Sequence, residues 1–223
     1  VTSNTERAAM FDAMNEVIAA LHTVDYKSVG LGDFGREGGY VARQIGRWSK
    51  QYKASETETI DAMERLMDWL PARLPAHDET TLVHGDYRLD NLVFHPTEPR
   101  VIGVLDWEIA TLGNPLADFA YHVMAWRVSP DEFRGLREVD INGLGIPDEA
   151  AYTAAYAKRT GRDALPDWEF YMAYNLFRMA AILQGIMGRV RDGTAANPEA
   201  ARMGALVRPL ADLAWAQAEK IGD

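Results

Sequence analysis

The stretch that decides the fold lies in the middle of the chain, where short apolar runs alternate with polar turns. It reads Leu82-Val83-His84-Gly85-Asp86-Tyr87-Arg88-Leu89-Asp90-Asn91-Leu92-Val93-Phe94 and, after a turn with two prolines, Val101-Ile102-Gly103-Val104-Leu105-Asp106-Trp107. The runs at 80–83, 91–94 and 101–105 are rich in Val, Leu and Ile and are bounded by turn residues, which predicts three short β-strands. The polar residues of this stretch therefore stand at strand ends.

Pairing of these strands places their polar ends at one edge. Asp86 lies between the first two strands, Asn91 begins the second, and Asp106 directly follows the third. Carboxylate and amide oxygens suit Mg²⁺, which usually takes one or two carboxylates together with the phosphates of its substrate. The sequence therefore predicts a magnesium site at this edge.

The order Asp-x₄-Asn, followed by an Asp at a strand end, is the arrangement that phosphoryl transfer requires. One Asp orients the attacking hydroxyl and accepts its proton, while an Asn and a second Asp hold the metal. We therefore predict Asp86 as a catalytic residue, and Asn91 and Asp106 as metal ligands. Arg88, two positions after Asp86, is a second candidate catalytic residue because its guanidinium can bind the γ-phosphate.

Two further polar residues are predicted to support the loop. Each polar residue of the stretch 84–106, taken singly, is a common turn residue. The whole set in this order favours a functional site over a simple turn. His84 ends a strand and is predicted to be a hydrogen-bonded structural residue. Asp118 falls in the first turn of a helix that begins at Pro115, where it either holds the loop or simply complements the helix dipole.

The segments on both sides of this stretch have helical spacing. Ser3-x-x-Glu6 and Ser55-x-x-Glu58 are capping-box patterns, and Asn114-Pro115 is an N-cap followed by proline at the first helical position. Helices are predicted from Ser3, over 40–52, from Ser55, from Asn114, over 148–160, over 167–190, and from Asn197-Pro198 with a kink at Pro209. The predicted fold class is α+β and mostly helical, one unit over 1–223: helical over 1–78, short strands carrying the loops over 80–107, and helical over 114–222.

Composition excludes several classes of protein. The chain has 223 residues and a formal net charge of −10, and it contains no cysteine. Nucleic-acid and anionic-membrane surfaces need clustered Lys and Arg, so we expect neither partner. No apolar run reaches the length of about 18 residues that spans a bilayer. We expect a cytoplasmic protein.

The motifs together resemble a known superfamily. His84-Gly85-Asp86 with Asn91, then Leu105-Asp106-Trp107, then Gly113-Asn114-Pro115-Leu116-Ala117-Asp118, resemble the aminoglycoside phosphotransferase and choline kinase superfamily. Leu21-His22-x-x-Asp25 and the stretch from Gly30 resemble the branch whose relatives are fused to acyl-CoA dehydrogenases. The resemblance implies a kinase-like fold and a Mg²⁺- and ATP-dependent kinase, with Asp86 catalytic, Asn91 and Asp106 on magnesium, and Asp118 supporting the loop.

The resemblance extends only to the C-terminal lobe of that kinase-like fold. Gly30-x-Gly32-x-x-Gly35 matches a phosphate-loop pattern, but no apolar strand precedes it and Asp33 would place a carboxylate among the phosphates, so we interpret it as a surface loop. No other phosphate loop or strand lysine precedes the first helix, and the chain begins at Val1. We therefore expect the N-terminal lobe to be absent, and this chain alone to bind nucleotide weakly and to turn over slowly or not at all.

The sequence leaves the acceptor and two other functions open. The leading interpretation is transfer of the ATP γ-phosphoryl group to a hydroxyl of a small molecule, which the sequence does not identify. A metal-dependent phosphohydrolase using His84, Asp86, Asp90 and Asp106 is a second hypothesis. A non-catalytic, pseudokinase-like binding module is the third.

Overall fold

A computed structural model describes residues 3–194 and 200–222, and the chain in it forms two compact units. Unit 1 comprises the described residues of Val1–Gly38 and Glu79–Pro166, and unit 2 those of Gly39–Asp78 and Asp167–Asp223. The structure is mostly helical with a few short strands, as the sequence predicts. The assignment of the whole chain to one lobe stays a prediction.

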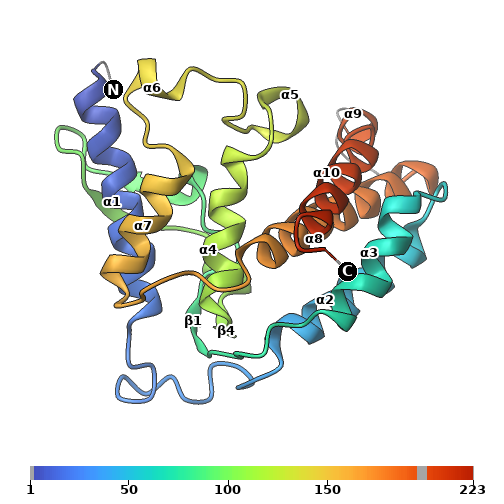
Figure 1. Cartoon of the computed structure of the whole chain (residues 1–223), viewed down its shortest axis with the longest axis horizontal. Helices are drawn as coiled ribbons and strands as arrows, with labels where there is room; N and C mark the ends of the chain where they lie inside the picture. The colour runs from blue at the N-terminus through green and yellow to red at the C-terminus, as the bar shows by residue number, and fades with distance from the viewer. Residues whose placement is uncertain (1–2, 195–199, 223) are drawn as a thin grey trace. The chain divides into compact units, whose positions relative to one another are not determined.

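Unit 1 begins with helix α1, Asn4–His22, which packs against α7, Glu149–Arg159 (Figure 1). The predicted capping box is present: Ser3 Oγ accepts from the Glu6 amide, and the Glu6 carboxylate accepts from the Ser3 amide. Both satisfy backbone groups that a helix start leaves unpaired. Met14 and Ile18 of α1 are buried in the core of unit 1.

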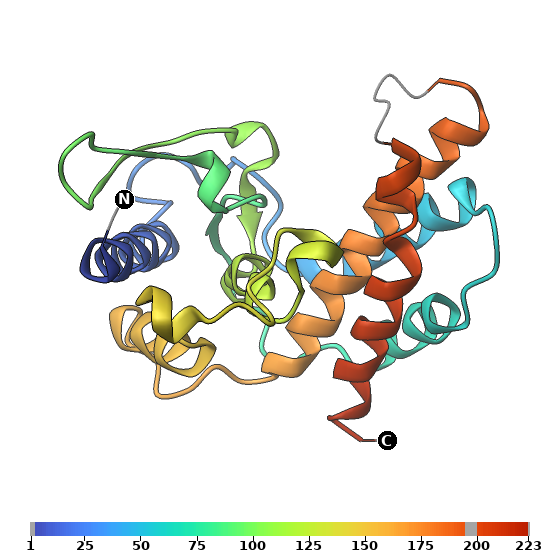
Figure 2. The same ribbon diagram turned by 90° about the horizontal axis from the view of Figure 1, so that it is seen from above.

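The strands of unit 1 form two separate antiparallel pairs, and this corrects the expectation of a single sheet edge. Strand β1, Thr81–Val83, pairs with β4, Thr111–Gly113, which the sequence analysis did not predict. Strand β2, Leu92–Phe94, pairs with β3, Val101–Val104, and Figure 2 shows the turn that joins them in green. The residues between the strands form two short 3₁₀ helices, η1 over Leu89–Asn91 and η2 over Trp107–Ile109.

The remaining helices of unit 1 follow β4. Helix α4, Pro115–Val123, is capped as predicted, since Asn114 Oδ1 accepts from the Ala117 amide at 3.0 Å. After it come η3 (Met124–Trp126), α5 (Pro130–Phe133), α6 (Ile141–Leu144) and α7. Every residue of α4 is buried, so this helix forms the centre of unit 1.

In the described residues of unit 2, all of the regular secondary structure is helical. The helices are α2 (Tyr40–Ser55), α3 (Asp61–Ala72), α8 (Trp168–Arg191), α9 (Ala200–Gly204) and α10 (Val207–Glu219). Two predictions fail here. Ser55 opens no helix but ends α2, where its hydroxyl donates to the Gln51 carbonyl. Pro209 causes no kink because it lies in the first turn of α10, where a helix needs no proline N–H. The predicted start at Asn197-Pro198 lies outside the described residues.

The glycine-rich segment at 30–35 is a turn region on unit 1, as interpreted from the sequence. Gly35 lies directly against β4: a Cβ there would stand 2.3 Å from Thr111 Oγ1 and 2.7 Å from the Leu112 amide nitrogen. The glycine at this position therefore permits backbone contact with the strand, and it needs no phosphate to explain it.

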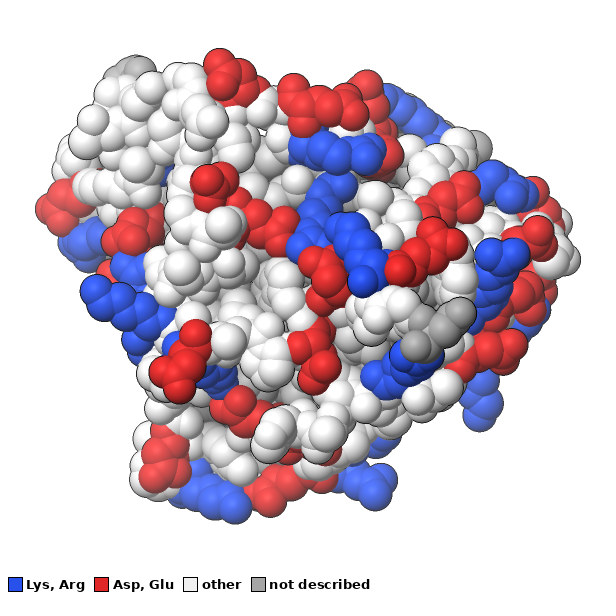
Figure 3. All heavy atoms as spheres, in the orientation of Figure 1, with Lys and Arg blue, Asp and Glu red and all other residues white. Residues whose placement is uncertain are grey.

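Among the described residues, no helix is long and apolar enough to cross a membrane. On the face seen in Figure 3, acidic and basic side chains are interspersed. The net charge of −10 is thus not gathered into one acidic field on that face.

Candidate active site

Both carboxylate oxygens of Asp86 accept hydrogen bonds from other side chains of unit 1. Oδ2 accepts from Asn91 Nδ2 at 2.9 Å, and Oδ1 accepts from the Tyr121 hydroxyl at 2.5 Å. The side chain is one-quarter exposed. Asp86 is therefore held in one orientation while it stays accessible to a ligand.

Asn91 is buried and turned so that its oxygen is available. Its Nδ2 donates to both the backbone carbonyl and the carboxylate of Asp86, at 2.8 and 2.9 Å. Because both partners are acceptors, they must face the NH₂ group, and the amide oxygen Oδ1 points away from them. That oxygen accepts no hydrogen bond from a described residue, so Asn91 has one oxygen free for a cation.

A backbone hydrogen bond between Leu105 and Asn91 brings Asp106, the residue after Leu105, close to Asn91. The Leu105 amide donates to the Asn91 carbonyl at 2.8 Å, so Asp106 directly follows the residue paired with Asn91. Asp106 has φ 60° and ψ 50°, a left-handed conformation that is uncommon outside glycine. Its carboxylate is exposed and makes no hydrogen bond or ion pair with a described residue. A strained backbone that presents an unpaired carboxylate is typical of functional sites.

Asp118 holds the backbone at the start of the loop at residues 84–91, which joins β1 to β2. Its Oδ2 accepts from the His84 amide at 2.9 Å and its Oδ1 from the Gly85 amide at 2.8 Å. Burial alone would raise the pKa of Asp118, but the hydrogen bond from His22 and those two amides outweigh it and lower the pKa below its usual value. Asp118 is therefore a buried anion that fixes the loop, and this favours the supporting role over the simple dipole interpretation.

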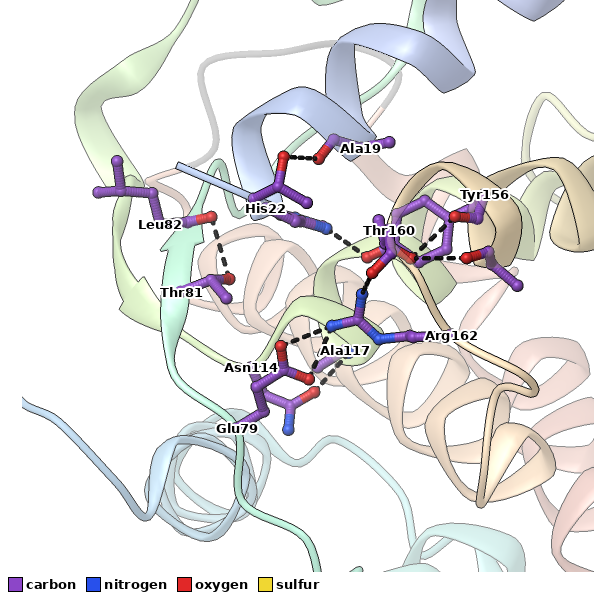
Figure 4. Close-up of polar contacts among 12 residues, drawn as sticks. Ala19, His22, Glu79, Thr81, Leu82, Asn114, Ala117, Tyr156, Thr160 and Arg162 are labelled. Atoms are coloured by element: carbon purple, nitrogen blue, oxygen red, sulfur yellow. Dashed lines mark hydrogen bonds and ion pairs between the residues drawn. The ribbon is translucent and has the colours of Figure 1, made fainter. Parts of the chain in front are cut away.

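A second layer behind Asp118 comes from α1 and α7. His22 Nε2 lies 3.1 Å from Asp118 Oδ2, and its Nδ1 lies 2.6 Å from the Tyr156 hydroxyl, an interaction that Figure 4 shows. Beyond α7, Arg162 donates to both carboxylate oxygens of Glu79, just before β1 (Figure 4). The loop is thus tied to the two helices that flank it.

His84 has no ring nitrogen left for a metal or a proton transfer. Nε2 lies 2.7 Å from the Leu105 carbonyl, which only accepts, so Nε2 carries the hydrogen. Nδ1 then accepts from the Asp86 amide at 3.2 Å. The His84 ring therefore bridges the Leu105 carbonyl and the Asp86 amide. Both bonds are to backbone groups, as expected of a structural residue.

Arg88 lies beside the site but between two acids. Its Nε is 3.5 Å from Asp86 Oδ2 and its Nη1 is 3.5 Å from Asp90 Oδ2. Arg134, in a left-handed turn after α5, donates to the same Asp90 oxygen at 2.6 Å. Two guanidinium groups therefore stand next to the loop at residues 84–91, and only Arg88 was predicted from the sequence.

An apolar cavity of about 270 Å³ opens beside these residues. Its wall includes Tyr121, whose hydroxyl reaches Asp86, and Arg88, Asp90 and Arg134 supply its charged groups. Aromatic, methionine and aliphatic side chains supply most of the remaining lining: Phe11, Met14, Met124, Ala125, Trp126, Val128, Phe133 and Leu136. An apolar molecule of modest size fits this lining.

The structure brings some predicted residues together and adds others. Asp86 and Asn91 are in direct contact, Asp106 is connected to Asn91 through Leu105, and His84 and Asp118 both bond to the loop backbone. Four further residues make contacts at the site that the sequence did not predict: His22, Tyr121, Tyr156 and Arg134. Tyr121 had a signal, because it follows Asp118 by three positions on a predicted helix and so shares its face.

Comparison with known proteins now places the chain. The profile of the Phosphotransferase enzyme family matches residues 1–174. The chain belongs to this family. The match covers all of unit 1, including each residue of the loop described above.

Relatives of this phosphotransferase family member confirm the resemblance stated from its sequence. Acyl-CoA dehydrogenase family member 10 of Mus musculus is 47% identical over 221 residues, which is 98% of this chain but 21% of the mouse protein. The chain thus spans about a fifth of that relative. A solved Ralstonia eutropha structure, provisionally assigned as an aminoglycoside phosphotransferase, is 57% identical with a TM-score of 0.95, covering 98% of this chain and 67% of its own.

More distant solved structures share the fold of this phosphotransferase family member. An aminoglycoside phosphotransferase in ternary complex with AMP-PNP and hygromycin B is 15% identical with a TM-score of 0.60, over 98% of this chain and 67% of its own. At that identity the likeness shows the fold alone. The kinase-like fold expected from the motifs is therefore present.

Proposed function

We propose that this chain carries the catalytic residues of a kinase that transfers the γ-phosphoryl group of ATP to a hydroxyl of a small molecule. The observation that carries the proposal is the arrangement of Asp86, Asn91 and Asp106. An oriented, accessible carboxylate stands beside a buried amide with one free oxygen, and the unpaired carboxylate of Asp106 follows the end of the adjoining strand β3. We further propose that the chain is the C-terminal lobe of this kinase-like fold.

In the proposed reaction, Asp86 orients the acceptor hydroxyl and takes its proton. As the new O–P bond forms at the γ-phosphorus, the bond from that phosphorus to the β,γ-bridging oxygen breaks and ADP leaves. Asp86 can serve because each carboxylate oxygen has two lone pairs, and Tyr121 and Asn91 each occupy one of them. Arg88, next to Asp86, supplies positive charge near the transferring group.

The donor set fits magnesium. The free oxygen of Asn91 and the carboxylate of Asp106 are hard oxygen ligands, and Mg²⁺ needs few of them because phosphate and water complete its shell. When bound, the ion neutralises negative charge on the transferring phosphoryl group. Among the described residues no three His, Asp or Glu side chains gather as a metal cluster, so this site would rest on one amide and one carboxylate.

The hairpin next to these ligands has an exposed apolar face that suits a nucleotide base. Val93 stands opposite Gly103, and strand alternation puts Leu105 on the same face as Gly103. Val93 is 38% exposed and Leu105 is 49% exposed. Because Gly103 has no side chain, the face is flat between them, and we propose that the adenine lies against it. The solved relative with AMP-PNP is consistent with a nucleotide as phosphoryl donor.

The cavity beside Asp86 is the proposed place of the acceptor. Its apolar lining favours an acceptor whose hydroxyl is carried on an apolar body over one that is polar throughout. The solved relatives named for aminoglycosides therefore do not fix the acceptor of this chain.

Transfer of labelled phosphate tests the proposal. The full-length gene product is mixed with [γ-³²P]ATP, MgCl₂ and, in turn, kanamycin, choline, 1-hexanol or 6-hydroxyhexanoate, and labelled acceptor is counted. We expect labelled product with at least one acceptor, and Asp86→Asn should lower kcat by about 10²- to 10⁴-fold because the base is lost. Asp131→Asn, an exposed carboxylate of the same unit, is the matched control and should transfer at the wild-type rate.

Three results would contradict the proposal. The first is an absence of labelled acceptor, and the second is full activity in Asp86→Asn. The third is phosphate release from p-nitrophenyl phosphate without ATP, which would favour the phosphohydrolase hypothesis. That hypothesis uses His84 as a ligand, and both its ring nitrogens are already bonded.

A further inference from the structure

The hydroxyl of Tyr121 is bonded directly to the proposed base. Tyr121 lies on α4, is buried, and donates to Asp86 Oδ1 at 2.5 Å. Asp118, one helical turn earlier on the same helix, accepts from the amides of His84 and Gly85. Helix α4 therefore contacts the catalytic loop twice: Asp118 fixes its backbone, and Tyr121 bonds to its reactive side chain.

A carboxylate needs such a partner because its own torsion does not fix it. Rotation about the last bond of an Asp side chain is broad, with no sharp staggered minima. Asn91 holds Oδ2, but one hydrogen bond leaves the carboxylate free to swing about it. The second bond, to Oδ1, fixes the plane of the group and so the direction of its remaining lone pairs.

Other buried tyrosines of unit 1 use their hydroxyls differently. Tyr87 donates to the Met14 backbone carbonyl at 2.8 Å, and the Tyr152 hydroxyl lies 2.8 Å from His122 Nε2. These bonds join elements of the fold and do not involve Asp86. The Tyr121 hydroxyl bonds to Asp86, and Tyr121 is also one of the residues that line the apolar cavity.

We infer that Tyr121 is a positioning residue for phosphoryl transfer, which orients the Asp86 carboxylate toward an acceptor bound in the cavity that Tyr121 helps to line. This inference rests on the proposed function. It assigns the hydroxyl and the ring separate tasks: the hydroxyl sets the direction of the base, and the ring contacts the acceptor. Removing the hydroxyl alone should therefore slow the chemical step and leave binding intact.

The Tyr121→Phe variant tests this, because it keeps the ring and deletes the hydroxyl. With the acceptor that gives most labelled product, we expect kcat to fall by about 10- to 100-fold, as a misdirected catalytic group costs rate. The KM values for ATP and acceptor should stay within about twofold, since the cavity wall is unchanged. Tyr152→Phe is the matched control: it also deletes one buried hydroxyl of unit 1, and its kcat should equal that of the wild type.

A double-mutant cycle gives a second readout that needs no acceptor. Thermal unfolding of Tyr121→Phe, Asp86→Ala and the double variant should be non-additive, because the two side chains share one hydrogen bond and alanine removes its acceptor. Additive effects, or a Tyr121→Phe enzyme with wild-type kcat, would overturn the inference while leaving the proposed function intact if Asp86→Asn is inactive. If Asp86→Asn is fully active, the proposed function itself fails.

Discussion

At the scale of single residues, one buried carboxylate from outside the loop at residues 84–91 holds the start of that loop. Asp118 accepts two backbone amides and faces His22, so three groups of unit 1 share its charge. A carboxylate suits this place because both its oxygens only accept. An amide of the same shape has one acceptor and one donor end, and the donor end would face a backbone N–H.

Asp118→Asn should therefore destabilise the fold and slow transfer. We expect a loss of about 2–3 kcal/mol in the free energy of unfolding, because one buried N–H is left without an acceptor and a buried charge is removed from its partners. Urea denaturation followed by circular dichroism measures the loss. Asp163→Asn, an exposed carboxylate after α7, is the control and should shift the urea midpoint little; equal shifts in both variants would contradict the role of Asp118.

Contacts of the site between residues close in the sequence could be predicted, whereas contacts between distant residues could not. Asp86 and Asn91 are five residues apart, and their contact follows from a short turn between two strands. The contact of His22 with Asp118 joins residues 96 positions apart, and that of Tyr121 with Asp86 joins residues 35 positions apart. No local sequence pattern encodes such contacts, because they depend on which faces of distant helices pack against the loop in the folded protein.

At the scale of elements, α4 positions the site, and its start is fixed by sequence. Asn114 caps the helix, Pro115 fits the first turn because its missing N–H is not needed, and the apolar residues behind it are buried. The prediction of this helix succeeded because cap and periodicity agree. The Ser55 pattern failed because Ser55 is the last residue of α2 and its hydroxyl bonds back to its own helix.

Asn114→Ala should loosen the start of α4. The loss of the bond to the Ala117 amide should cost about 1 kcal/mol in the free energy of unfolding. Asn114→Ser is the matched variant, because a serine hydroxyl can accept from the same amide and should restore most of that stability. Thermal melting of both proteins measures the difference, and melting temperatures that are equally low in both would mean that the cap is not the reason.

Strand β4 was missed for a physical reason. Thr111–Gly113 is a short segment directly before a helix cap, and its β-structure depends on pairing with β1. Strands of three residues have too little local preference to be recognised alone, and their partner decides their conformation.

At the scale of the whole molecule, stability should depend on pH through a buried histidine. Burial is the main cause that lowers the pKa of His122 from 6.5 to about 4, against a smaller opposing effect of the Asp118 charge. The folded chain therefore keeps His122 neutral where the unfolded chain takes up a proton. Its contribution to stability is complete above about pH 6.5 and is lost as the pH falls toward 4.

The free energy of unfolding should fall by a few kcal/mol as the pH is lowered through that window. His122→Asn should show a shallower decline between about pH 6.5 and about pH 4, because one titrating group is gone. Urea midpoints of both proteins across this range measure the difference in slope. Asp118, whose pKa is lowered, loses its contribution only below its usual range, so it does not account for a decline above that range; parallel curves would contradict the role of His122.

The division of the chain into two units also sets an order of assembly during synthesis. Every residue of unit 1 precedes Asp167, whereas α2 and α3 of unit 2 leave the ribosome long before their partners α8 and α10. The proposed catalytic loop can thus fold while Tyr52 and Leu66, both fully buried in the finished protein, still lack the helices that cover them. A nascent chain in which residue 166 has just left the ribosome would hold all of unit 1 while α2 and α3 still expose their apolar faces, and this is the stage at which a chaperone would be most useful.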